Sequence, residues 1–285
     1  MAQVKFIEFL KDIKIEHTLF ALPFAITSMF MAIDSLPEIK LFFWIILAMV
    51  GARSWAMAFN RIVDAEYDRK NERTKNRAIP AGRLSKKQMF FYAFIALLIF
   101  EISAYEINHL AFLLSPLAIF IISFYSFTKR FSYFSHFFLG LSLAIAPVGA
   151  WVAVKEEISL ISILLGCAVL FWTAGFDILY SLQDIEFDKK EGLYSFPVKF
   201  GIEKSLLTAR IMHAIMILFL IILSYPAALG RFYILGIVLC GIFIAYEHFI
   251  VKPSDLSRIN QAFFTVNAVV SVAIMIFTIA DIFLR

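Results

Sequence analysis

Nine long apolar runs limit what this chain can fold into more than any other feature of its sequence. A helix needs about 20 predominantly apolar residues to cross the hydrocarbon core of a bilayer. Only 17% of the residues are charged and 61% are hydrophobic, against about 25% and about 45–50% in soluble domains. We therefore predict an all-α integral membrane protein with nine transmembrane helices, residues 1–285 forming a single membrane domain. The expected helices are 18–34, 41–59, 89–107, 109–127, 137–154, 158–177, 207–225, 231–250 and 262–284.

Lysine and arginine concentrate in alternate loops between these runs. Segments 60–88 and 178–206 are long and hold nine and four Lys or Arg residues, whereas segments 34–40, 155–157 and 226–231 each hold a single one. Because cytoplasmic loops carry an excess of Lys and Arg, we expect the N-terminus and both long loops in the cytoplasm and the C-terminus outside. The net charge of +4 is modest and lies in these loops. The distribution of these charges indicates how the protein is oriented in a lipid bilayer, and no binding of nucleic acid is predicted.

The two long loops also resemble each other. They follow the second and sixth runs, and each begins with acidic residues and continues with basic ones. This arrangement predicts a pseudo-repeat of residues 1–130 and 131–250, with 262–284 as a ninth helix outside it. Before the first run, the spacing of Val4, Phe6 and Phe9 favours a short amphipathic helix at the membrane surface.

Acidic side chains recur at helical spacing where the long loops begin. Asn60, Asp64 and Asp68 are four residues apart, so they share one helix face. Asp184 follows Asp177 by seven residues and Asp188 follows Asp184 by four, so these three side chains also share one helix face. We call these sets the first and second acidic stripes.

An ionised carboxylate at membrane depth is costly, so such residues normally face a cavity and have a function. Carboxylates repel a diphosphate, but they bind one through Mg²⁺, whose coordination shell phosphate oxygens and water complete. Nearby Arg and Lys side chains can bind the same phosphates directly. The stripes therefore predict a site for Mg²⁺ and a diphosphate, and the alternative is that these acidic residues are simply solvated at helix ends.

Both stripes lie in longer stretches that resemble the two signatures of the UbiA-type prenyltransferases. The first stretch runs from Asn60 to Gly82, with Ala78 after Arg77 where that family usually has Pro, and the second runs from Asp177 to Asp188. Nine helices with the motifs after helices two and six match the family layout. The resemblance implies a helical bundle around a central cavity, cytoplasmic cap loops after helices 2 and 6, and Mg²⁺-dependent transfer of a polyprenyl group from polyprenyl diphosphate.

Roles for individual residues follow from the stripes and this resemblance. Five side chains are expected to hold two Mg²⁺ ions, three from the first stripe and two from the second: Asn60, Asp64, Asp68, Asp184 and Asp188. Four cations are expected to bind the diphosphate: Arg69, Arg73, Arg77 and Lys129.

Three residues are candidates for direct roles in catalysis. Lys129 and Arg130 lie in a segment that resembles a family motif, so they are candidates to bind the diphosphate or an acceptor carboxylate, or else to anchor the chain at the interface. Asp177 lies deeper than the rest of its stripe and could bind an acceptor hydroxyl or remove a proton; its alternatives are a third metal-side carboxylate and a structural partner. Four histidines show no partner pattern and are expected to have local structural roles: His109, His136, His213 and His248.

The acceptor is the least determined part of this prediction. The stretch from Gln183 to Ser195 most resembles family members that act on aromatic acids, which favours 4-hydroxybenzoate, with a dihydroxynaphthoate of menaquinone synthesis as the alternative. Many members have an Arg–Pro pair early in the first helix, where this chain has the stretch from Glu16 to Pro23. Lys14, Glu16 and His17, at the start of that helix, are candidates either to face the acceptor or to anchor the helix. The expected location is the cell inner membrane, multi-pass, with the active site facing the cytoplasm. An ion-coupled secondary transporter is the alternative of another class.

Overall fold

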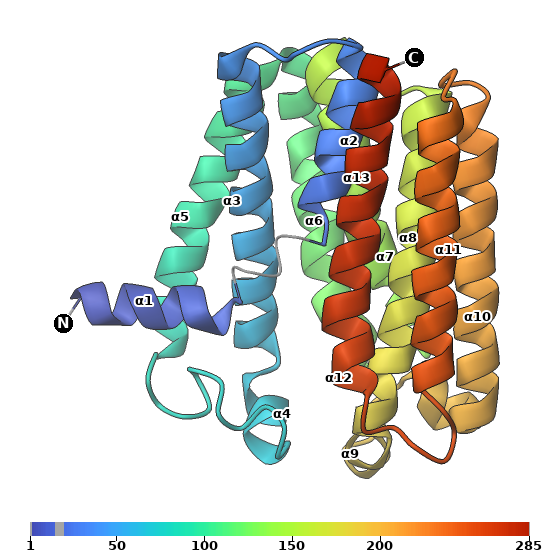
Figure 1. Cartoon of the computed structure of the whole chain (residues 1–285). Coiled ribbons are helices and arrows are strands. Elements are labelled where there is room, and N and C mark those ends of the chain that lie inside the picture. The colour runs from blue at the N-terminus through green and yellow to red at the C-terminus, as the bar shows by residue number, and fades with distance from the viewer. Residues whose placement is uncertain (1, 15–19, 285) are drawn as a thin grey trace. The chain divides into compact units, whose positions relative to one another are not determined.

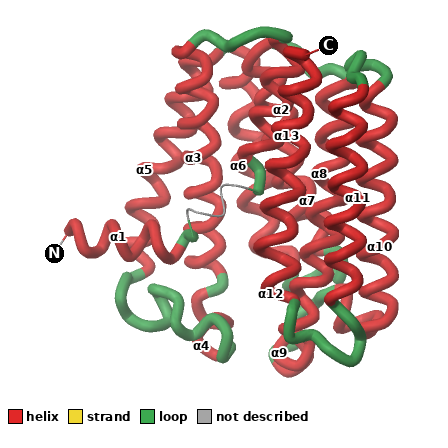
Figure 2. The backbone as a smooth tube through the Cα atoms, viewed as in Figure 1, coloured by secondary structure: helices red, strands yellow, loops and turns green. Residues whose placement is uncertain are grey.

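The computed structural model describes residues 2–14 and 20–284, and within these ranges it contains helices and no strand (Figures 1 and 2). The predicted all-α membrane fold is confirmed. The chain divides into two compact units. The first comprises Met1–Thr18 and Phe42–Phe127, and the second comprises Leu19–Leu41 and Thr128–Arg285. Because 19–41 belongs with the second unit, these units do not follow the predicted halves 1–130 and 131–250, and the pseudo-repeat stays a prediction.

The first unit is built mainly from two long helices and a tight helical hairpin. Its elements are α1 (Ala2–Asp12), most of α3 (Ile39–Val63), α4 (Ala65–Lys70), α5 (Lys86–Ile107) and nearly all of α6 (His109–Thr128). A capping box between Ser85 and Gln88 begins α5. At the other end, the extended backbone of Asn108 separates α5 from α6, and its Oδ1 accepts a 2.7 Å hydrogen bond from the Ala111 amide. The predicted break at Asn108 is thus confirmed.

Close packing fixes the helices of the first unit against one another. A Cβ added to Gly51 of α3 would lie 2.8 Å from the Ala96 carbonyl oxygen of α5, so only glycine allows this approach. Trp55 Nε1 donates to Ser123 Oγ at 2.9 Å and links α3 to α6. The Phe9 ring of α1 lies 5.1 Å from that of Tyr92 in α5. The predicted amphipathic segment is therefore a helix anchored by aromatic contacts.

The second unit is a bundle of longer helices with a buried apolar core. Its elements are α2 (Leu22–Ile33), α7 (Ser135–Lys155), α8 (Leu160–Ser181), η2 (Leu182–Asp184), α9 (Ile185–Lys190), α10 (Phe196–Ser224), α11 (Arg231–Ile250), α12 (Ile259–Gln261), the π-helical η3 (Ala262–Val266) and α13 (Asn267–Leu284). In Figure 1, α8 packs beside α10, and α11 packs beside α13. The core includes Phe24, Trp172 and Met216, all fully buried.

A buried polar network connects four helices of this bundle. Asn267 accepts from Trp172 Nε1 at 2.7 Å and donates to Glu247 Oε1 at 3.2 Å. His213 Nδ1 lies 2.9 Å from His248 Nε2, and its Nε2 lies 3.3 Å from the Trp172 carbonyl oxygen. These bonds satisfy polar groups that would be costly to leave unpaired in an apolar bundle. They give His213 and His248 the structural role expected of them.

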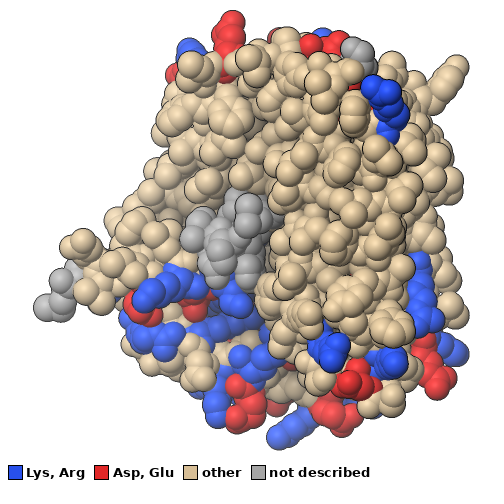
Figure 3. Space-filling model, in the orientation of Figure 1, with Lys and Arg blue, Asp and Glu red and all other residues tan. Residues whose placement is uncertain are grey.

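The lengths and surfaces of the helices show a multi-pass membrane protein. Within the described residues, eight helices are long and apolar enough to span a bilayer, and they match eight of the nine predicted runs. The remaining run, 18–34, corresponds to α2, whose described part has 12 residues. The count of nine spans and their orientation therefore stay predictions. Among the described residues, the charged side chains on the visible face gather toward the ends of the helices (Figure 3).

Candidate active site

The first acidic stripe lies across the junction of α3 and α4. The amide of Asp64 donates to the Asn60 carbonyl oxygen at 2.9 Å, and the amide of Asp68 donates to that of Asp64 at 2.8 Å. Helical spacing therefore continues through the junction and keeps the stripe on one face. Asn60 Nδ2 donates to Asp64 Oδ2 at 2.8 Å, while its Oδ1 accepts from Arg61. Here the amide oxygen of Asn60 is already bonded, and its role as a metal ligand stays a prediction.

Asp68 combines a strong cationic partner with an open coordination position. Its residue is 5% exposed, and its Oδ1 accepts a 2.6 Å hydrogen bond from Arg77 Nη1. Its Oδ2 is buried and has no hydrogen-bond partner among the described residues. Such an oxygen is expensive to leave unpaired, so this carboxylate fits a bound cation.

The three predicted diphosphate arginines of the first loop occupy different environments. Arg77 contacts the stripe through Asp68, whereas Arg69 pairs with the exposed Glu66 at 3.3 Å. Lys86 also lies 3.2 Å from Glu66 and, together with Arg69, lowers the pKa of that carboxyl. Arg73 lies in the exposed loop, where its amide donates to Asn71 Oδ1 at 2.9 Å. Arg77 therefore contacts a predicted metal ligand, Asp68.

Asp12, which the sequence analysis did not select, holds the first stripe from the end of α1. Its Oδ1 accepts from the Ala78 amide at 2.6 Å, and its Oδ2 lies 3.6 Å from Arg61 Nε. Arg61 also donates to the Asp12 carbonyl oxygen at 3.3 Å. A buried arginine needs an anionic partner, and Arg61 inside the motif was the signal that such a partner exists. Asp12 thereby links Arg61, which follows Asn60, to Ala78, which follows Arg77.

The second acidic stripe is interrupted by a change of helix type. The α-helix α8 ends at Ser181, and a single 3-10 turn, η2, carries Asp184 into α9. Asp184 and Asp188 are 6% and 2% exposed. Asp188 Oδ2 lies 3.6 Å from Lys129 Nζ, but it accepts no hydrogen bond within the part of the chain that the structure describes. Asp188 thus faces its cation through the same buried oxygen that accepts no hydrogen bond, whereas Asp68 uses one oxygen for Arg77 and leaves the other unpartnered.

The loop after the second stripe is tied to the site residues by its backbone. The amide of Leu193 donates to the Asp188 carbonyl oxygen, and the amide of Tyr194 donates to that of Lys129, both at 2.8 Å. Gly192 has φ +67°, a left-handed conformation that glycine adopts without cost. Its turn lets the chain fold back onto α9. The predicted cap function of this loop stays a prediction, but its backbone does contact two predicted site residues.

Asp177 has a partner that sequence reasoning missed. Its Oδ2 lies 2.6 Å from Nδ1 of His136, which lies in the first turn of α7 and is fully buried. Position 130, the remaining catalytic candidate, is a partly buried Arg just after α6. At the start of the first run, the Lys14 carbonyl oxygen accepts from Arg53 Nη2 at 3.3 Å, while Glu16 and His17 lie outside the described residues.

The donor set fits a metal that arrives with a phosphate ligand. Within residues 2–14 and 20–284, no group of three or more His, Cys, Asp or Glu side chains is arranged to enclose a metal ion. Mg²⁺ commonly takes one or two carboxylates and fills its remaining positions with water and substrate phosphates. In the first unit the unpartnered Oδ2 of Asp68 suits such an ion, and in the second unit the Oδ2 of Asp188, which accepts no hydrogen bond among the described residues, does so separately.

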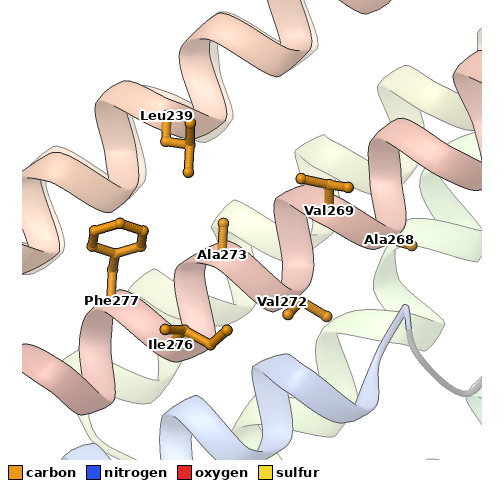
Figure 4. A pocket seen from close by; sticks show the side chains of 7 residues that line it. All are labelled: Leu239, Ala268, Val269, Val272, Ala273, Ile276 and Phe277. Atoms are coloured by element: carbon orange, nitrogen blue, oxygen red, sulfur yellow. The ribbon is translucent and has the colours of Figure 1, made fainter.

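An apolar pocket of about 400 Å³ lies elsewhere, along α11 and α13 (Figure 4). Leu239 contributes from α11, and the other lining residues come from α13: Ala268, Val269, Val272, Ala273, Ile276 and Phe277. None of these side chains is polar, so the pocket offers nothing to bind a diphosphate or a metal.

Comparison with known proteins identifies the family. The sequence profile of the UbiA prenyltransferase family matches residues 21–269. The chain belongs to this family. It is therefore a prenyltransferase, and the predicted membership of the UbiA-type prenyltransferases is confirmed.

Individual UbiA relatives resemble the chain over most of its length. A UbiA homolog from Aeropyrum pernix K1, solved in the apo state, is 32% identical with a TM-score of 0.85, covering 94% of this chain and 98% of that one. A UbiA homolog from Archaeoglobus fulgidus bound to DMAPP and Mg²⁺ has a TM-score of 0.72 at 21% identity, covering 98% of this chain and all of that one (100%). A 4-hydroxybenzoate octaprenyltransferase of Francisella tularensis subsp. novicida is 29% identical over 238 residues, 84% of each chain.

Proposed function

We propose that this UbiA prenyltransferase transfers a polyprenyl group from its diphosphate to the ring of an aromatic acid, 4-hydroxybenzoate, in quinone biosynthesis. The observation that carries the proposal is the pair of buried carboxylates that each combine a cationic neighbour with an unpartnered oxygen, Asp68 beside Arg77 and Asp188 beside Lys129. The relatives named 4-hydroxybenzoate octaprenyltransferase support the acceptor. The A. fulgidus homolog bound to DMAPP and Mg²⁺ supports the donor class and the metal.

The two stripes would hold the metal ions. Asp64 and Asp68, with Asn60, are assigned to one Mg²⁺, and Asp184 and Asp188 to the other. When bound, Mg²⁺ neutralises charge on the diphosphate and makes it a better leaving group. The hydrogen bond from Asn60 to Asp64 and the ion pair of Arg77 with Asp68 orient the carboxylates for this purpose.

The chain's cations would bind the leaving group. Arg77 and Lys129 already lie against the stripes, and Arg69 and Arg73 come from the same loop as Arg77. Fixed positive charge where negative charge develops stabilises the transition state. The allylic C–O bond breaks, its electron pair leaves with the diphosphate, and an allylic carbocation remains. Surrounding apolar and aromatic side chains exclude water from this cation and can stabilise it.

The acceptor side would be formed by Asp177 with Lys129 or Arg130. A ring carbon beside the acceptor hydroxyl attacks the cation and forms the new C–C bond. That carbon then loses its proton, and aromaticity returns. We assign the Asp177 carboxylate to the hydroxyl and to acceptance of this proton, and one of the two cations to the acceptor carboxylate. The reaction would take place at the cytoplasmic face of the cell inner membrane.

A dihydroxynaphthoate is the second candidate acceptor, since it also presents a carboxylate and a ring activated by hydroxyl groups. Family membership removes the ion-coupled transporter from consideration. The deciding experiment incubates purified protein with Mg²⁺, both acceptors together and polyprenyl diphosphates of mixed length, followed by mass analysis of the products. We expect prenylated 4-hydroxybenzoate. Prenylation of the naphthoate alone would contradict the acceptor, and failure to prenylate either aromatic acid would contradict the proposed function.

A further inference from the structure

His136 has both ring nitrogens in use although it is fully buried. Its Nδ1 lies 2.6 Å from Asp177 Oδ2, 41 residues away in sequence. Its Nε2 lies 3.4 Å from the backbone nitrogen of Phe196. The ring therefore bridges α7, α8 and the first residue of α10.

These two contacts determine where the imidazole carries its proton. A backbone N–H can only donate, so Nε2 must present its lone pair to Phe196. In the neutral ring the hydrogen is then on Nδ1, where it donates to Asp177. A bond at each nitrogen also fixes the rotation of the ring.

The same contacts leave Asp177 with one oxygen available to a ligand. Among the described residues, His136 is the hydrogen-bond partner of this carboxylate, and it contacts Oδ2 alone. The Asp177 side chain remains 15% exposed. With Oδ2 held from behind, Oδ1 is the atom that can accept a bond from a hydroxyl group.

Phe196 connects this pair to the loop beside the second stripe. The two residues before Ser195 are Leu193 and Tyr194, whose amides are bound to the carbonyl oxygens of Asp188 and Lys129. His136 thus joins Asp177 to a segment whose backbone is hydrogen-bonded to a predicted metal ligand, Asp188, and a predicted phosphate ligand, Lys129.

We propose that His136 is a positioning residue for acceptor binding: its Nδ1–H aims the Asp177 carboxylate at the hydroxyl of the aromatic acceptor, while its Nε2 fastens the 193–196 segment through the Phe196 amide. The inference rests on the proposed function, because it assigns Asp177 to the acceptor. It adds a residue that acts through Asp177 without touching substrate.

Two conservative variants separate the two bonds. In His136→Asn the amide nitrogen stands near the place of Nδ1, so it can still donate to Asp177 but cannot accept from Phe196. In His136→Gln the amide oxygen reaches the place of Nε2 and can accept from Phe196, while the bond to Asp177 is lost. His213→Asn is the matched control, since His213 is also buried in this unit and lies outside the proposed site.

The first measurement is kinetic. A misplacement of about 1 Å can cost about 100-fold in rate, so His136→Gln should lower acceptor kcat/KM by about 10- to 100-fold and leave the donor KM unchanged. His136→Asn should lose less, and His136→Gln combined with Asp177→Asn should be no worse than Asp177→Asn alone. The positioning role would be overturned if the double variant lost acceptor kcat/KM by the product of the two single losses. It would also be overturned if His136→Gln lost no more acceptor kcat/KM than His213→Asn.

The second measurement needs no activity. Hydrogen–deuterium exchange at the Phe196 amide should accelerate in His136→Asn and stay close to wild type in His136→Gln, the reverse of the kinetic order. Equal exchange in both variants would overturn the link to the 193–196 segment. If the wild type prenylates no aromatic acid, the proposed function fails and the acceptor role fails with it, whatever the exchange data show.

Discussion

Replacing Asp68 by Asn separates the electrostatic role of the first stripe from its structural role. Asparagine has the same shape, and its Oδ1 can still accept from Arg77 Nη1, which lies 2.6 Å from Asp68 Oδ1. The fold therefore loses only the charge assistance of that bond, about 1–2 kcal/mol of stability. Catalysis loses the negative charge that we propose to hold Mg²⁺ at the unpartnered Oδ2. Removal of one such electrostatic group costs about 3–4 kcal/mol, so kcat should fall about 100-fold or more.

Glu66→Gln is the matched control because Glu66 lies in the same short helix, α4. Its side chain is 62% exposed and pairs with Arg69 and Lys86 on the solvent side. We expect kcat to change by less than about twofold, since exposed ion pairs contribute little. Both variants should be assayed for prenylated product at saturating substrates and Mg²⁺, with thermal unfolding in detergent as the measure of folding.

The double variant Asp68→Asn, Asp188→Asn tests whether the stripes act together. Residues that act as one catalytic unit lose much less in combination than the product of their single effects. The reasoning is refuted if Asp68→Asn keeps full kcat, or if Glu66→Gln loses as much as Asp68→Asn while both remain folded.

Three further predictions address other parts of the molecule. A reporter fused after Arg285 should behave as external, and a cytoplasmic signal would contradict the nine-helix topology. Lys129→Ala or Arg130→Ala should raise the acceptor KM more than the donor KM if that residue binds the acceptor carboxylate; an equal rise would assign it to the diphosphate. Asp12→Asn leaves Arg61 buried without its anionic partner, which should destabilise the protein by about 3 kcal/mol. The control Glu8→Gln, at the exposed pair with Arg83, should have little effect on the unfolding temperature. Equal unfolding temperatures for the two variants would show that the Asp12–Arg61 pair does not hold α1.

Features that depend on local spacing were predictable from the sequence. Asn60, Asp64 and Asp68 share a face because helix geometry alone places residues four apart together. The break at Asn108 follows from one polar residue between two apolar runs, and α1 follows from its amphipathic pattern. In each case the information lies within a few turns of one helix.

Pairs that depend on tertiary packing were not predictable in this way. His136 and Asp177 are 41 residues apart, and Arg61 and Asp12 are 49 apart. No periodicity in one segment indicates which distant side chain will meet it. The 3-10 turn at Leu182–Asp184 was also missed, because seven-residue spacing from Asp177 to Asp184 reads as one continuous helix. The hydrogen bond between Asn267 and Glu247, 20 residues apart, likewise depends on the packing of α11 against α13.

Metal dependence tests the central claim most directly. Wild-type protein is incubated with polyprenyl diphosphate and 4-hydroxybenzoate, and the prenylated acceptor is quantified with Mg²⁺, with excess chelator, and after Mg²⁺ is restored. If the two acidic stripes act through Mg²⁺ on the leaving diphosphate, product formation should stop in chelator and return with Mg²⁺. Undiminished prenyl transfer in excess chelator would show that the stripes are not a metal site and would contradict the account.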